Sequence, residues 1–181
     1  MKQLIFVTSN DGKAREAAAV LGTTIKRVKL NLDELQSVDL RAIVEHKVRG
    51  AYAQLKQPVI AEDVSFAIKQ LNGLPGPLIK WFEEGIGSQG VADMLSKPDR
   101  SVRWIVAYGF FDGKTFFYAE GVTDGTVAKK VKGSEGFGFD TIFIPKGYTK
   151  TTAQLGVAEK IKFGSRTKAL LKLKKILNAR T

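Results

Sequence analysis

Apolar and polar positions alternate along the chain with two periods, one typical of strands and one typical of helices. Residues 4–7 form a short apolar run that predicts a strand, and the apolar positions of 14–21 keep a helical spacing up to Gly22. A second helical stripe covers about 39–55, and residues 58–61 predict a strand that ends at the acidic residues which follow it. Strands that alternate with helices in this way indicate an α/β fold.

The second half of the chain predicts further strands around a tight turn. Asp112-Gly113 lies between the apolar runs 102–111 and 115–119, which is the strongest hairpin signal in the sequence. The remaining expected elements are two short helices at 78–84 and 89–96, strands near 122–131 and 141–144, and a C-terminal helix. No repeat, low-complexity run or linker interrupts residues 1–181, so we expect a single domain with a mixed sheet flanked by helices.

The composition is typical of a water-soluble globular protein. Of the 181 residues, 44% are hydrophobic and 26% are charged, and no apolar run approaches the roughly 20 residues that a membrane-spanning helix needs. The chain has no cysteine and one histidine, which excludes disulfides and thiol catalysis and argues against a zinc site. We therefore expect a cytoplasmic protein that does not bind membranes.

The formal net charge is +11, and most of the excess lies in one segment. From Lys160 to the C-terminus the chain has eight basic residues and no acidic one, while Leu170, Leu173 and Leu177 repeat at helical spacing. This pattern predicts an amphipathic helix whose lysines form a solvated face. Contact with nucleic acid and steering of an anionic substrate are the two alternatives, and the solvated face is the preferred interpretation.

A polar turn joins the first predicted strand to the first predicted helix. Its residues are Thr8, Ser9, Asn10, Asp11, Gly12 and Lys13. Ser9 or Asn10 can cap the helix, whose free N–H groups and positive dipole end attract an anion, and Lys13 adds a full positive charge. The turn is therefore a candidate phosphate-binding site, although an ordinary helix cap with a solvent-exposed lysine has the same pattern.

Two adjacent carboxylates, Glu62 and Asp63, directly follow a predicted buried strand. Adjacent side chains on an extended backbone point to opposite sides, so one can face a metal ion while the other hydrogen-bonds inward. Glu34 and Lys47 are weaker candidates for functional residues. Lys47 lies at the edge of the apolar stripe of the second helix, where a lysine commonly extends its ammonium into water. The alternative for all four residues is ordinary solvation of loops and helix edges.

A glycine-rich segment at residues 133–140 precedes a predicted strand. An exposed Phe137 or Phe139 beside Gly138 can stack on a nucleobase, and Asp140 can accept a hydrogen bond from a ring or exocyclic N–H. The alternative is a β-bulge with a buried phenylalanine.

Taken in order, these segments resemble the inosine triphosphatase family, the pyrophosphatases of non-canonical purine nucleoside triphosphates. The most specific matches are Asn72-Gly73-Leu74-Pro75-Gly76-Pro77 and Gly136-Phe137-Gly138-Phe139-Asp140. The resemblance covers nearly the whole chain, and its other matches are Thr8-Ser9-Asn10 with Lys13 and Glu16, Glu62-Asp63, Ile79-Lys80-Trp81-Phe82, Glu159-Lys160, and Arg166 with Lys168-Ala169-Leu170.

This resemblance implies a fold, a reaction and a set of residue roles. Members of the family have a two-lobed α/β fold with a long central mixed sheet and a substrate cleft between the lobes. They commonly form homodimers. They use Mg²⁺ to hydrolyse inosine, deoxyinosine and xanthosine triphosphates to the monophosphate and pyrophosphate. The implied roles are phosphate binding by residues 8–13, Lys47 and Lys80; magnesium binding by Glu34 and Asp63; catalysis by Asp63 as general base with Glu62 beside it; and base recognition by Phe137, Gly138, Phe139, Asp140, Lys160, Ser165 and Arg166.

The sequence departs from the family pattern in the base pocket. Gly164-Ser165-Arg166 stands where members usually have Ser-His-Arg, and Glu159-Lys160-Ile161 where they have Glu-Lys-Asn. Arg166 and Lys160 can still donate to a 6-keto oxygen, whereas the 6-amino group of adenine would meet donor against donor. We therefore expect a pyrophosphatase that cleanses the nucleotide pool. A related pyrophosphatase with a shifted base preference and a non-catalytic nucleotide- or nucleic-acid-binding module are the alternatives.

Overall fold

The computed structural model describes residues 4–136 and 138–179 and confirms the α/β fold class. Within these ranges the central sheet has seven strands. Their order is β2 (Ile25–Val28), β1 (Leu4–Val7), β3 (Val59–Ile68), β5 (Ser101–Phe111), β6 (Phe116–Val127) and β7 (Phe143–Pro145), with β4 (Pro75–Gly76) paired to β3. The chain divides into two compact units. Unit 1 is made of Met1–Asp63, Val106–Gly121 and Arg166–Thr181, and unit 2 of Val64–Ile105 and Val122–Ser165.

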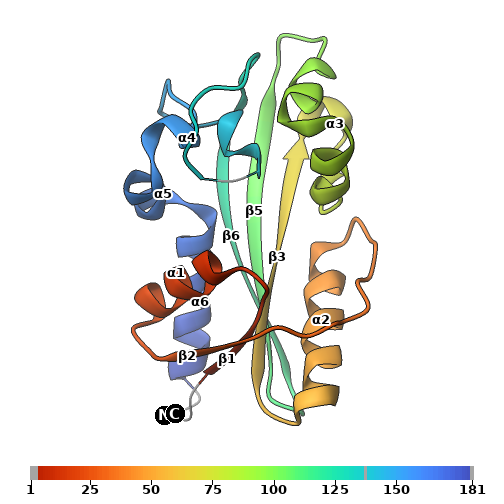
Figure 1. The fold of residues 1–181 in the computed structure, drawn as a ribbon, viewed down its shortest axis with the longest axis vertical. Helices are drawn as coiled ribbons and strands as arrows, with labels where there is room; N and C mark the ends of the chain where they lie inside the picture. Colours follow the sequence, from red (N-terminus) through yellow and green to blue (C-terminus); the bar gives the residue numbers. More distant parts are fainter. Residues whose placement is uncertain (1–3, 137, 180–181) are drawn as a thin grey trace. The chain divides into compact units, whose positions relative to one another are not determined.

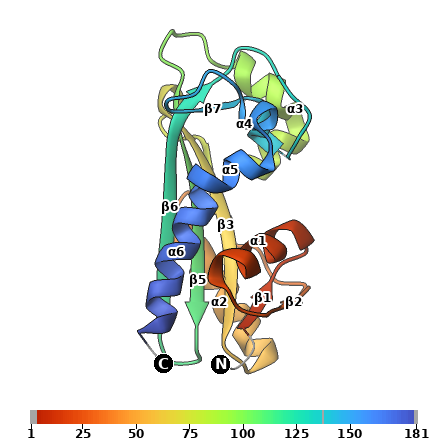
Figure 2. The same ribbon diagram turned by 90° about the vertical axis from the view of Figure 1, so that its left-hand side faces the viewer.

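Unit 1 is built on parallel strands that helices cover on both faces. The central strand β1 (Leu4–Val7) pairs in parallel with both β2 (Ile25–Val28) and β3 (Val59–Ile68). The helices of this unit are α1 (Asp11–Leu21), α2 (Leu40–Leu55) and nearly all of α6 (Ser165–Asn178). Figures 1 and 2 show α2 on one face of these strands and α1 and α6 on the other. Strands covered on both faces must be apolar on both sides, which explains the uninterrupted apolar runs at 4–7 and 59–61.

Local sequence explains where α1 and α2 begin and where α1 ends. The Asn10 side chain accepts a hydrogen bond from the Lys13 amide at 3.0 Å and caps α1. Gly22 ends the same helix in a left-handed conformation with φ 66°. The Asp39 side chain accepts from the Arg41 and Ala42 amides and caps α2. Both helices match the sequence prediction.

Unit 2 contains the remaining parts of β3, β5 (Ser101–Phe111) and β6 (Phe116–Val127), strands that contribute residues to both units. Its other elements are β4 (Pro75–Gly76), β7 (Phe143–Pro145), α3 (Ile79–Asp93), α4 (Thr152–Leu155), α5 (Val157–Phe163), and 3-10 turns at Lys69–Leu71 and Gly138–Thr141. The two short helices predicted at 78–84 and 89–96 are one element, α3, with a kink at Gly87. Among the described residues no helix is long and apolar enough to cross a membrane.

The core of unit 2 is a cluster of aromatic side chains. The Phe66 ring lies 5.5 Å from Trp104, 5.0 Å from Phe139 and 6.0 Å from Phe143, measured between ring centroids. All three pairs meet edge to face, which is a favourable arrangement for aromatic quadrupoles. Phe66, Phe139 and Phe143 are fully or almost fully buried, so β3, β5, β7 and the 138–141 turn share one hydrophobic centre.

Some elements differ from the sequence prediction. β3 does not end before the Glu62-Asp63 pair but continues to Ile68, because Phe66 and Ala67 pair with β4 and bury the strand further. β6 is one continuous strand where we expected two, since its C-terminal part pairs with β7. The prediction also lacks β2, α4 and α5, which have four, four and seven residues. Segments this short carry too few periodic positions to be recognised.

Candidate active site

Glu62 lies inside β3, and donors of unit 1 surround its carboxylate, whose side chain is 1% exposed. Its Oε2 accepts from Arg166 Nε at 2.8 Å and from the Tyr108 hydroxyl. Its Oε1 accepts from Arg166 Nη2 at 3.0 Å and lies 3.0 Å from Lys13 Nζ. A carboxylate offers about four lone-pair sites, so these four contacts use the hydrogen-bonding capacity of Glu62.

The same network continues to a second acidic residue. Arg166 Nη1 donates to Glu16 Oε2 at 2.9 Å, and Glu16 stands three residues after Lys13 on α1. The charges of Lys13, Glu62, Arg166 and Glu16 therefore alternate in sign. Buried charges are tolerated when each is paired and hydrogen-bonded, and this arrangement meets that condition with groups from α1, β3, β5 and α6.

The network sets the ionisation of its members. Burial alone raises the pKa of Glu62, but the charges of Arg166 and Lys13 and the hydrogen bonds from Arg166 and Tyr108 outweigh it, so the pKa lies well below its ordinary value of 4.5. Burial and the negative charge of Glu62 raise the pKa of Tyr108 well above 10.0. At neutral pH Glu62 is thus an anion, and Tyr108 is a neutral hydrogen-bond donor.

Asp63 is the next residue of β3 and points to the opposite face of the strand. Its Oδ2 lies 2.5 Å from Nζ of Lys47, which belongs to α2, whereas Glu62 contacts residues of α1 and α6. Lys47 Nζ also lies 3.9 Å from Glu34 Oε1. The prediction that the adjacent carboxylates separate to opposite sides is therefore confirmed, and Asp63 and Glu34 share one ammonium group.

Glu34 and Asp63 are the predicted magnesium ligands, and their chemistry suits that ion. Mg²⁺ prefers carboxylate and phosphate oxygens and keeps several waters, so one or two protein carboxylates with substrate phosphates suffice. In the part of the chain that the structure describes, no group of three or more His, Cys, Asp or Glu residues gathers as a metal site. Glu34 and Asp63 are too few to hold a metal ion by themselves. They suit an ion whose remaining ligands are waters and substrate phosphates.

The predicted phosphate-binding turn forms the start of α1. Thr8 Oγ1 accepts from the Asn10 amide at 3.1 Å, and Asn10 in turn caps the helix. Asp11 forms an ion pair with Arg27 at 2.6 Å on the surface, and Ser9 and Gly12 are exposed. Of the six residues of the turn, Lys13 is the one that enters the Glu62 network.

Comparison with known proteins shows which family this chain belongs to. A model of the Ham1 family matches residues 4–176. The chain belongs to the Ham1 family. It is 39% identical over 174 residues to a dITP/XTP pyrophosphatase of Methanopyrus kandleri, covering 93% of this chain and 92% of the relative. It is 36% identical over 193 residues to an inosine triphosphate pyrophosphatase of Scheffersomyces stipitis, covering 98% of each chain.

Solved structures of the Ham1 family confirm the fold. A HAM1 protein from Coxiella burnetii superposes with a TM-score of 0.89 at 24% identity, over 99% of this chain and 100% of that one. The Ham1 protein of Staphylococcus aureus superposes with a TM-score of 0.81 at 21% identity, over 99% and 100% of the two chains. The resemblance to the inosine triphosphatase family is thus confirmed along nearly the whole length of the protein.

The predicted base-recognition residues of this Ham1-family protein lie mostly in unit 2, where Asp140 is ion-paired with Lys160. Lys160 Nζ is 2.6 Å from Asp140 Oδ2 and 5.2 Å from the ring centroid of Trp104. Burial and the negative charges of Glu84 and Asp140 raise the pKa of Glu83, which stands near this pair. The Lys160 ammonium thus contacts both a carboxylate and the face of an aromatic ring.

The structure does not support the expected aromatic platform at Phe139. Its ring is completely buried against Phe66, because the Gly138–Thr141 turn folds the side chain into the core of unit 2. A ring packed on this cluster has no exposed face for a base, so the alternative of a core phenylalanine is correct for this residue. Phe137, the other predicted platform, lies outside the described residues.

Ser165 and Arg166 are also engaged within the protein. Ser165 is buried, and its hydroxyl donates to the backbone carbonyl of Trp104 at 2.7 Å. Arg166 donates through Nε, Nη1 and Nη2 to Glu62 and Glu16. Lys80, predicted to bind phosphate, is exposed on α3, and its Nζ lies 5.4 Å from the ring of Trp81.

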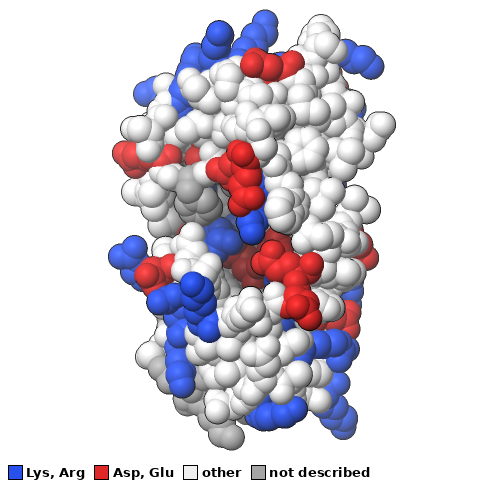
Figure 3. All heavy atoms as spheres, turned by 45° about the vertical axis from the view of Figure 1, so that its right-hand side comes forward, with Lys and Arg blue, Asp and Glu red and all other residues white. Residues whose placement is uncertain are grey.

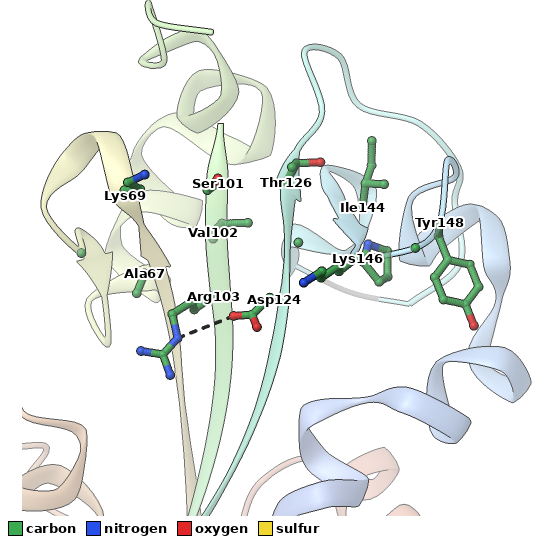
Figure 4. Close-up of a pocket in the computed structure, with 14 residues that line it drawn as sticks. Ala67, Lys69, Ser101, Val102, Arg103, Asp124, Thr126, Ile144, Lys146 and Tyr148 are labelled. Atoms are coloured by element: carbon green, nitrogen blue, oxygen red, sulfur yellow. Dashed lines mark ion pairs between the residues drawn. The ribbon is translucent and has the colours of Figure 1, made fainter. Parts of the chain in front are cut away.

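Unit 2 has a pocket of about 780 Å³ that none of the predicted site residues lines. Figure 4 shows side chains from β3, β5, β6 and the β7 region around it, with Arg103 directed toward Asp124. These two groups form a long ion pair of 3.7 Å, and both are more than half exposed. Because solvent screens such pairs strongly, this ion pair contributes little to holding the pocket wall together.

Most lysines of α6 are exposed, as the helical pattern predicts, whereas Arg166 of the same helix is buried. Ala169, Leu170 and Leu173 are completely buried, while Lys168, Lys172 and Lys175 are exposed. Figure 3 shows that Asp and Glu are interspersed with Lys and Arg on the face it presents. Lys168, Lys172 and Lys175 thus belong to the exposed face of α6.

Sequence reasoning gave no role to Tyr108 and Trp104. Tyr108 follows two buried apolar residues of β5 and looks like an ordinary core aromatic. The sequence offers one indication of a role for Tyr108, because a tyrosine hydroxyl that is buried with its strand normally has a hydrogen-bond partner. That partner, Glu62, is 46 positions away in the chain.

We predict that Glu62 makes the stability of the protein sensitive to acid. Because its folded-state pKa lies below the ordinary value of 4.5, the stabilisation is fully present above that value and is lost as the pH falls through the folded pKa. Glu62→Gln should cost about 3–5 kcal/mol at pH 7, since it leaves Arg166 without its buried partner. Thermal unfolding between about pH 5 and pH 3 should show a shallower loss for the variant. Equal slopes for both proteins would contradict this assignment.

We also predict that the histidine typical of the family does not fit at position 165. Ser165→His should lower the free energy of unfolding by roughly 1–3 kcal/mol, because a larger ring must enter a buried position that a hydroxyl now fills. Ser165→Ala, the matched control, removes only the hydrogen bond to Trp104 and should cost less than the histidine. Chemical denaturation measures both. A histidine variant as stable as the natural protein would show that this site has room for the ring.

Proposed function

We propose that this protein hydrolyses non-canonical purine nucleoside triphosphates, such as inosine, deoxyinosine and xanthosine triphosphates, to the monophosphate and pyrophosphate. The relatives named dITP/XTP and inosine triphosphate pyrophosphatases support this substrate class, since they match over more than nine tenths of the chain. Removal of such nucleotides from the nucleotide pool is the corresponding role.

The observation that carries the proposal is the division of charge on the two faces of β3. On one face Lys13 lies at the start of α1, held by Glu62. On the other face Asp63 and Glu34 surround Lys47. Cations for phosphate oxygens and carboxylates for a hard metal ion are therefore positioned by consecutive residues of one strand.

In the proposed reaction a water oxygen attacks the α-phosphorus and the bond to the bridging α–β oxygen breaks. The water proton passes to Asp63 or to solvent, and pyrophosphate leaves with the electron pair of the broken bond. Magnesium, for which Glu34 and Asp63 are the proposed ligands, would neutralise phosphate charge. Lys13, Lys47 and Lys80 are proposed to neutralise further phosphate charge.

For base selection we propose Lys160 together with Asp140. An ammonium donates to the 6-keto oxygen of inosine or xanthosine, whereas the 6-amino group of adenine would leave it opposite another donor. Arg166 remains a proposed base contact, but in the structure its donors bind Glu62 and Glu16. Recognition by Arg166 would therefore require one of these contacts to open.

We propose in addition that the protein is a homodimer, as the family resemblance implies, and that it is cytoplasmic, as its composition indicates. Light scattering coupled to size-exclusion chromatography measures the assembly state directly.

A panel of nucleoside triphosphates tests the function. With Mg²⁺ present, inosine and xanthosine triphosphates should yield pyrophosphate with a kcat/KM at least about tenfold above that for adenosine triphosphate, the discrimination expected from one unpaired buried donor. Pyrophosphate is distinguished from phosphate by a coupled assay. Absence of pyrophosphate from every substrate would reject the reaction, and equal values for inosine and adenosine triphosphates would reject the base preference alone.

The proposed role of Asp63 is tested by its amide. Asp63→Asn keeps the size of the side chain but removes the charge, so kcat should fall by on the order of 10²–10⁴ while the fold is retained. Asp124→Asn is the matched control, because Asp124 is an exposed carboxylate of β6 outside the proposed site. Circular dichroism checks the fold of both. Turnover near that of the natural protein would remove Asp63 from the mechanism.

A further inference from the structure

Lys47 holds the same carboxylates that are proposed to bind magnesium. Its ammonium lies 2.5 Å from Asp63 Oδ2 and 3.9 Å from Glu34 Oε1, and it comes from α2 while its partners come from β3 and from the segment before α2. A metal ion that ligates Asp63 would meet this ammonium at the same carboxylate. Two cations on one carboxylate repel each other strongly where water screens poorly.

The surroundings of the pair make this competition effective. The side chains of Lys47 and Asp63 are 19% and 18% exposed, so solvent screens their attraction only in part. The Glu34 side chain is 50% exposed and can adjust to a second partner. A lysine ammonium is a point charge on a flexible four-carbon stem, so it can leave Asp63 without movement of the helix that carries it.

We propose that Lys47 is an internal counter-ion that the metal displaces, and that its displacement couples metal binding to triphosphate binding. Without ligands Lys47 neutralises Asp63 and Glu34. When a metal takes these carboxylates, the ammonium is released and its three donors become available to phosphate oxygens. The inference rests on the proposed function for the identity of the two ligands, and it adds that one residue links their affinities.

Linkage fixes the signs of this coupling. A triphosphate that draws Lys47 away from Asp63 must strengthen metal binding, and the metal must strengthen triphosphate binding by the same factor. Lys47 therefore opposes the metal when it is alone and favours the triphosphate. Loss of the ammonium should strengthen metal binding and weaken triphosphate binding. A general loss of folded structure would weaken both.

The first measurement is the affinity for Mn²⁺ of the protein without nucleotide, followed by electron paramagnetic resonance. Lys47→Met keeps the length of the stem and removes the charge, and it should lower the Kd for Mn²⁺ by about tenfold or more, the strength of a charge-assisted contact. Lys26→Met is the matched control, because Lys26 is exposed on β2. It should leave the Kd unchanged within about twofold. Asp63→Asn combined with Lys47→Met should abolish the gain.

The second measurement is binding, without metal, of inosine triphosphate with a methylene group in place of the α–β bridging oxygen. Lys47→Met should weaken this binding by about tenfold, and Lys26→Met should leave it unchanged. The proposal is overturned if Lys47→Met binds Mn²⁺ no more tightly than the natural protein, or if it loses affinity for both ligands together.

These outcomes are separate from the test of the function. Pyrophosphate release by the natural protein with an unchanged Mn²⁺ affinity in Lys47→Met would refute the coupling and leave the function. Tighter Mn²⁺ binding in that variant, in a protein that releases no pyrophosphate from any substrate, would confirm the competition at Asp63 and refute the function.

Discussion

The negative charge of Glu62 inside β3 is the constraint on which the organisation of unit 1 depends. An ionised carboxylate that is nearly inaccessible to water costs several kcal/mol unless positive and polar groups surround it. Here those groups come from α1, β5 and α6, and Arg166 lies 104 positions from its partner. The charge therefore connects the first helix, a central strand and the last helix. Removal of one partner would leave an uncompensated buried charge, whereas removal of one apolar side chain from a hydrophobic contact would only reduce the buried apolar area.

Strand periodicity turns this structural requirement into a functional arrangement. Because neighbouring side chains of β3 point to opposite faces, two consecutive carboxylates have different partners: Glu62 accepts from Arg166 and Tyr108, and Asp63 pairs with Lys47. Glu62 pairs with Lys13, while Asp63 pairs with Lys47, the counter-ion that we propose a metal displaces. Lysines of helices on both faces of the parallel strands supply a cation to each carboxylate, Lys13 from α1 and Lys47 from α2.

Unit 2 shows how the departures of this chain from its family pattern are accommodated. The Ser165 hydroxyl binds the backbone of β5 at Trp104, and Trp104 also lies near the ammonium of Lys160. The residue that differs from the usual histidine is therefore part of the support for the Lys160 and Asp140 cluster. Because Ser165 is engaged with the Trp104 backbone, the ion pair between Lys160 and Asp140 is the group that we propose to set the base preference.

The sequence by itself determined the α/β class, the polar cap and the glycine end of α1, the approximate span of α2, the hairpin at Asp112-Gly113 and the opposite directions of Glu62 and Asp63, because these depend on short-range periodicity and local hydrogen bonds. It also carried the family, since the specific motifs recur in order along the chain. Only the tertiary structure decided that Phe139 is a core residue and that Arg166 clamps Glu62. It also decided that Tyr108 is a donor and that Lys47 neutralises Asp63. These outcomes depend on which buried groups meet across long separations in sequence, where the cost of an unpaired charge or an unfilled core selects partners that no local pattern records.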